Sequence, residues 1–141
     1  MIPKQIFFLC KDKNNIPQEL IENINFVINQ NPNHTVKIID NKMFESYYKK
    51  KDVNSFKNYY SKLNNKYGAM MADYMRYVLM YYEGGVYMDI KSRPKVPLDT
   101  FIKPKSDMIL FIWEQKGKGA FREYLNYFLI SKKAMIYTKK L

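Results

Sequence analysis

The spacing of apolar residues predicts the first elements of the chain. Residues 2–10 form a short apolar run that opens with proline, as is typical of a buried first strand. From 17 to 30, apolar residues recur every three or four positions, which predicts an amphipathic helix. The β-branched run 35–40 predicts a second strand. Residues 42–66 are weakly periodic and predict one or two short helices with loops.

The strongest helical pattern spans residues 64–85. One broad apolar face runs along it, made of Met70, Tyr74, Tyr77, Val78 and Tyr81. Gly84 and Gly85 end the pattern, because glycine accepts the positive φ that often terminates a helix.

Alternation replaces the helical period after the two glycines. Residues 86–90 predict a strand with Tyr87 and Asp89 on one face and the intervening apolar residues on the other. A loop at 92–99, a strand at 107–114, a basic loop at 115–119 and a helix, or helix plus strand, at 121–133 complete the prediction.

Strands that alternate with helices predict an α/β fold with a mainly parallel sheet flanked by helices. Ligands of such sheets bind beyond the carboxyl ends of the strands, and Asp89 falls at such an end. The chain has 141 residues, which fits one domain over residues 1–141.

Composition and charge bear on whether the protein binds nucleic acid or spans a membrane. The net charge is +11, which favours polyanions, and a basic nucleic-acid-binding protein is one alternative. The lysines are scattered, however, and only three arginines occur, so we expect a solvated basic surface and no specific nucleic-acid partner. No apolar run approaches the roughly 20 residues of a transmembrane helix. Together with the single Cys10, this predicts a cytoplasmic protein in a reducing compartment.

Three charged residues form the candidate chemistry. Asp73 and Arg76 are three apart on the predicted helix, so both side chains point to one side. The glycine pair lets the next strand carry Asp89 back toward them. Such a set can hold sugar hydroxyls, a ribose or a metal. Residue types alone favour the plainer interpretation, a helix salt bridge and a strand-capping aspartate.

The complete motif favours a binding site over a salt bridge and a strand-capping aspartate. Residues 72–99 resemble the signature block of DXD-motif glycosyltransferases of the capsular polysaccharide, mannosyltransferase and clostridial-toxin type. The matching positions are Asp73, Arg76, Tyr77, Gly84, Gly85, Tyr87 and Asp89. The opening strand and the "VPLDTFI" segment are similar to the same family more loosely.

The resemblance implies a GT-A-like, Rossmann-related fold and transfer of a sugar from a UDP- or GDP-sugar donor to a glycan or other acceptor, with retention of configuration. It implies that Asp73 and Arg76 contact the donor sugar, that Asp89 contacts ribose or sugar and a Mn²⁺ or Mg²⁺ ion, and that Phe7, Phe8 and Leu9 lie near the nucleotide base. Gly85 and Tyr87 belong to the same substrate-binding set.

Lys91 departs from the family pattern, because it stands where the second aspartate of the motif is expected. We assign Asp89 and Lys91 the catalytic positions, and three outcomes stay open. Asp89 and the diphosphate retain a weakened metal site; Lys91 replaces the metal by pairing with phosphate oxygens; or the site is an inactive sugar-nucleotide or glycan binder. Family members commonly carry more acceptor-side sequence, which leaves open a missing C-terminal extension, a partner chain or an oligomer.

Overall fold

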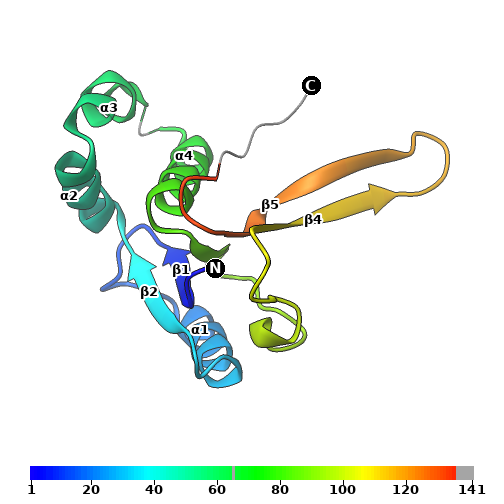
Figure 1. The fold of residues 1–141 in the computed structure, drawn as a ribbon. Helices are drawn as coiled ribbons and strands as arrows, with labels where there is room; N and C mark the ends of the chain where they lie inside the picture. Colours follow the sequence, from blue (N-terminus) through cyan, green and yellow to red (C-terminus); the bar gives the residue numbers. More distant parts are fainter. Residues whose placement is uncertain (65, 136–141) are drawn as a thin grey trace.

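A five-stranded sheet with helices on both faces forms the fold (Figure 1). The computed structural model describes residues 1–64 and 66–135, so residue 65 and positions 136–141 of the predicted domain lie outside the described residues. The strands are β1 (Gln5–Leu9), β2 (Thr35–Ile39), β3 (Gly85–Met88), β4 (Met108–Gln115) and β5 (Phe121–Ser131). The helices are α1 (Gln18–Gln30), α2 (Asn41–Lys51), α3 (Val53–Asn58) and α4 (Gly68–Glu83), with 3-10 turns η1 (Tyr60–Lys62) and η2 (Leu98–Thr100).

The sheet is mixed, with the strand order β2-β1-β3-β5-β4. Strand β1 pairs in parallel with β2 and with β3, whereas β5 runs antiparallel to both β3 and β4. The α/β class is confirmed, but the prediction of a mainly parallel sheet is corrected. The cause is the short connection between β4 and β5, which only an antiparallel hairpin can close. This hairpin extends away from the helices (Figure 1).

The prediction of a helix, or a helix plus a strand, at 121–133 is wrong in its helical part, because residues 121–131 form strand β5 throughout. Its aromatic residues recur at helix-like intervals, from Phe121 through Tyr124 to Tyr127 and Phe128. The ladders to β3 and β4 decide the outcome, since they satisfy the backbone on both sides of β5. A register shift between Leu110 and Ile112 also breaks the simple alternation that marks a strand.

Two apolar clusters pack on opposite faces of the sheet. Figure 1 shows the helices that cover these faces. Phe7, Tyr87 and Leu129 pack on one face under α2, α3 and α4. The alternate residues Phe8 and Val86 pack on the other face with α1. As predicted, the weakly periodic stretch 42–66 holds short helices. Within the described ranges, no helix is long and apolar enough to cross a membrane.

Helix α4 forms where predicted, but it buries only Val78 and part of Tyr74 from the predicted face. Its buried apolar residues are Met71, Met75, Val78, Leu79 and Met80. By contrast, Met70, Tyr77 and Tyr81 of the predicted face are 44%, 38% and 42% exposed. Apolar residues nearly surround this helix, so periodicity alone did not select the side that meets the sheet.

The glycine pair sets the path from α4 into the sheet. Gly84 and Gly85 have φ angles of +63° and +103°, which disfavour other residues. A Cβ on Gly85 would lie 2.7 Å from the carbonyl oxygen of Gln5 in the neighbouring strand. The close approach lets β3 run beside β1, and its far end then faces helix α4.

Candidate functional site

The buried guanidinium of Arg76 organises the site. Its Nη2 lies 3.1 Å from the carboxylate of Asp73 and 3.6 Å from that of Asp89. Its Nη1 donates a 2.7 Å hydrogen bond to the carbonyl of Asn126 in β5. The Arg76 side chain is only 7% exposed, while those of Asp73 and Asp89 are 46% and 42% exposed. The arginine therefore anchors two carboxylates that still face solvent.

Tyr87 contacts both Arg76 and Asp89 of this cluster. The guanidinium of Arg76 lies 4.9 Å from the centre of its ring, which is a cation–π contact. The hydroxyl donates a 2.6 Å hydrogen bond to Oδ1 of Asp89. Burial, followed by the bond to Asp89, raises the pKa of Tyr87 well above its usual range, although Arg76 opposes the shift. The hydroxyl therefore stays protonated and fixes the Asp89 carboxylate.

Asp89 opens a tight turn beyond the end of β3. The sequence predicted that the strand continues to residue 90, but it ends at Met88. The amide of Ser92 donates to the carbonyl of Asp89 at 2.7 Å, and Asn23 of α1 donates to the carbonyls of Ile90 and Ser92 at 3.0 and 2.8 Å. These bonds satisfy the carbonyls of Asp89, Ile90 and Ser92 without a neighbouring strand. Strand β3 therefore ends before these residues.

A cavity of about 530 Å³ opens beside the cluster. Arg76, Tyr87, Asp89 and Lys91 contribute its polar lining, together with Tyr127 of β5. This volume lies within the usual range of small-molecule pockets. Lys91 is exposed, and among the described residues its ammonium has no hydrogen-bond or ion-pair partner.

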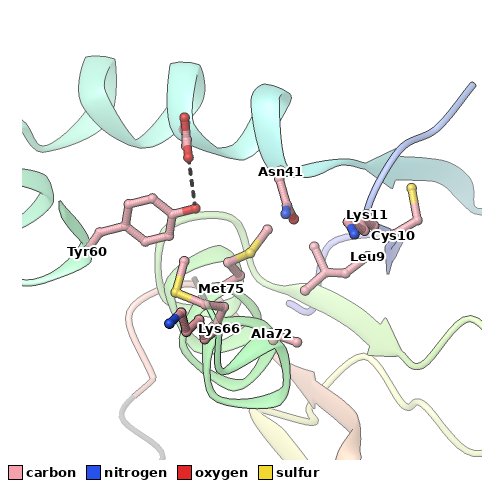
Figure 2. Close-up of a pocket in the computed structure, with 11 residues that line it drawn as sticks. Leu9, Cys10, Lys11, Asn41, Tyr60, Lys66, Ala72 and Met75 are labelled. Carbon is pink, nitrogen blue, oxygen red and sulfur yellow. Dashed lines mark hydrogen bonds between the residues drawn. The ribbon is translucent and has the colours of Figure 1, made fainter. Parts of the chain in front are cut away.

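A larger cavity of about 730 Å³ adjoins the first, because Leu9 and Ala72 line both. Figure 2 shows its lining, which comes from the end of β1, the start of α2, the segment before α4 and α4 itself. Tyr60 faces this space and donates a 3.4 Å hydrogen bond to Glu45. Lys11 and Lys66 are the cationic residues of its lining. Both cavities thus lie at the carboxyl end of β1, and the smaller one also lies at the carboxyl end of β3.

The structure brings together most, but not all, of the predicted site residues. Asp73, Arg76, Tyr87 and Asp89 form one cluster, and Lys91 and Leu9 line the cavity beside it. Phe7 and Phe8 do not reach it, since they are buried in opposite layers at 2% and 0% exposure. Gly85 lies at the other end of β3, where it allows the close approach to Gln5. The geometry gives these three residues packing roles.

Two residues of β5 that contact the cluster were not predicted from the sequence. Asn126 accepts from Arg76 through its carbonyl and donates to Asp73 at 3.4 Å through its side chain. The carbonyl of Tyr127 accepts the amide of Asp89 at 2.9 Å. Both residues lie in the segment that was predicted as a helix or a helix plus a strand, so no periodic signal connected them with the motif.

The donor set does not fit a divalent cation held by protein side chains alone. Oδ1 of Asp89 already accepts from Tyr87, Asp73 pairs with Arg76, and the next motif position is Lys91. Over the described parts of the chain, no three histidine, cysteine or acidic side chains gather as metal ligands would. Hard divalent cations prefer several oxygen ligands. A metal ion at Asp89 would therefore need further oxygen ligands from a bound substrate and water.

Comparisons with known proteins identify the family. Residues 17–109, more than half of the chain, match the model described as a glycosyltransferase sugar-binding region containing the DXD motif. No curated protein matched. Among solved structures, "PaToxG Glycosyltransferase" is similar, with a TM-score of 0.70 and 20% identity; the match covers 94% of this chain but 56% of that one. At this identity the likeness concerns the fold. The chain therefore belongs to the family of glycosyltransferases whose sugar-binding region contains the DXD motif.

Proposed function

We propose that this chain binds a nucleoside-diphosphate sugar and transfers the sugar to an acceptor, as a GT-A-like glycosyltransferase domain. The observation that carries the proposal is the Asp73–Arg76–Asp89 cluster, of which Arg76 and Asp89 line a cavity at the carboxyl ends of parallel strands. Open α/β sheets bind ligands at this edge. Family membership supports the same reaction class.

The cluster is suited to orienting a sugar. The exposed carboxylates of Asp73 and Asp89 can accept hydrogen bonds from sugar hydroxyls, while Arg76 holds both at fixed positions. The nucleoside then occupies the larger cavity between β1 and α4, and the diphosphate lies near Leu9 and Ala72, where the two cavities meet. Fixing the reactants in this way can lower a barrier by up to about 7–11 kcal/mol.

Retention of configuration is part of the proposal and follows from the family resemblance. Its test is the anomeric configuration of the first product, read by NMR before mutarotation. A product with inverted configuration would show that the enzyme does not retain configuration, but it would leave the transferase proposal intact.

The proposal is tested with a panel of UDP- and GDP-sugars, by the release of nucleoside diphosphate with and without Mn²⁺. We expect release from at least one donor and its loss in Asp89→Ala. Asp107→Ala is the matched control, because Asp107 pairs with Lys132 at the base of the hairpin, outside the site. Asp89→Ala with wild-type turnover refutes the site assignment.

The second candidate function is a sugar-nucleotide or glycan binder without turnover. Lys91 favours it, because the family motif carries an aspartate at this position. Binding of a donor in calorimetry, without release of nucleoside diphosphate under any metal condition, supports the binder over the enzyme.

A further inference from the structure

We propose that this chain holds the diphosphate of its ligand with lysine side chains, Lys91 first among them, and requires no divalent cation to do so. The inference rests on the proposed nucleotide-sugar site and specifies how that site handles charge.

The formal charges of the site support the inference. Asp73, Arg76, Asp89 and Lys91 carry two negative and two positive charges, which cancel. An aspartate at position 91 would leave the same set with two net negative charges, which repel a diphosphate unless a cation lies between them. With lysine at this position the repulsion is already absent. The usual electrostatic reason for a metal is thus removed by one substitution.

The free ammonium of Lys91 is available to a ligand. The other cation of the cluster, Arg76, is buried and engaged by Asp73, Asp89 and the Asn126 carbonyl. Lys91 instead extends from the turn into the lining of the 530 Å³ cavity, without a partner in the described residues. A lysine ammonium binds phosphate oxygens as a point charge and donates up to three hydrogen bonds.

The adjoining cavity adds two further cations. Lys11 and Lys66 line it, and Glu45 is its acidic residue (Figure 2). Over both cavities the lining thus contains Lys11, Lys66, Arg76 and Lys91 against Glu45 and Asp89. When Asp73, the ion-pair partner of Arg76, is counted as well, one net positive charge remains for the anionic groups of a nucleoside diphosphate. The three lysines come from three different segments of the chain.

The test is calorimetric titration of the chain with UDP and with GDP, in chelator and in Mn²⁺. We expect one of the two to bind with the same affinity, within about twofold, in both conditions. In chelator, Lys91→Ala should weaken that binding by roughly tenfold or more, because a charge-assisted hydrogen bond is lost. Lys91→Asp should weaken it further through repulsion, and Mn²⁺ should improve binding to this variant alone.

Lys95→Ala and Lys95→Asp are the matched controls. Lys95 is an exposed lysine in the loop after the turn and lines neither cavity, so both variants should bind within about twofold of wild type. Thermal unfolding of all four variants checks that each is folded.

Each outcome separates this inference from the proposed function. Wild-type binding that appears only with Mn²⁺ overturns the inference and leaves the transferase proposal standing. Undiminished binding by Lys91→Ala in chelator also overturns it. If neither UDP nor GDP binds in any condition, the proposed nucleotide-sugar site is wrong, and the inference is lost with it.

Discussion

The guanidinium of Arg76 lies 3.6 Å from the carboxylate of Asp89, which joins the middle of helix α4 to the end of strand β3. The two residues are brought together by the reversal at Gly84 and Gly85. Because the guanidinium also contacts Asp73 and the Asn126 carbonyl, one buried side chain connects three segments. The site and the packing of α4 on the sheet therefore depend on the same residue.

The first prediction concerns Arg76→Lys. A lysine ammonium has the charge but not the planar fork that reaches Asp73, Asp89 and the Asn126 carbonyl together. We expect a loss of about 2–4 kcal/mol in the free energy of unfolding by urea, since the buried cation loses part of its hydrogen bonds and ion pairs. Arg122→Lys is the control, because its exposed pair with Glu114 should contribute less than about 1 kcal/mol. Equal effects of the two substitutions would contradict the role given to Arg76.

The second prediction concerns Tyr87→Phe. The substitution keeps the ring beneath Arg76 but removes the hydroxyl that donates to Asp89. Stability should fall by about 1 kcal/mol, the usual net value of one hydrogen bond. Donor turnover should fall more than donor binding, because Asp89 is no longer held at one angle. A variant with unchanged turnover would show that the hydroxyl does not position Asp89.

A third prediction compares Gly85, the first residue of β3, with Gly68, the first residue of α4. Gly85→Ala should destabilise the chain by about 2 kcal/mol or more, since its φ is +103° and the added Cβ would meet Gln5. Gly68→Ala is the comparison, because nothing lies within 4 Å of a Cβ there. It should change stability by less than about 1 kcal/mol, in the stabilising direction. Chemical denaturation of both variants measures the difference, and similar values would exclude the close approach of β3 to β1.

The fourth prediction is a loss of stability at alkaline pH. Burial, then Glu45, raises the pKa of Tyr60 to about 12, and the hydrogen bond to Asp52, then burial, raises the pKa of Tyr82 to about 12. Unfolded tyrosines titrate near pKa 10. The native state therefore holds more protons between about pH 10 and 12, and its stability should be intact below pH 10 and fall across this window. Denaturation curves with tyrosinate absorbance check this, and stability that stays constant across the window would rule it out.

The sequence predicted the central part of the site because its signals are local. The helix that ends at the glycine pair, the strand after it and the approach of Asp73, Arg76 and Asp89 all follow from short-range spacing. The full extent of strand β5 was missed, because its conformation depends on pairing with β3 and β4 and not on its own pattern. The contributions of Asn126 and Tyr127 were lost with it. The turn at Asp89 was missed for a similar reason, since Asn23 of α1 stabilises it from a distant part of the chain.

The central claim is that the Arg76–Asp89 cluster and the cavity beside it hold a nucleoside-diphosphate sugar. A crystal structure of the chain soaked with the donor selected by the turnover panel tests it most directly. We predict the sugar hydroxyls within hydrogen-bond distance of Asp73 and Asp89, and the diphosphate beside Lys91. A donor bound elsewhere on the chain, with these side chains unoccupied at saturating concentration, would contradict the account.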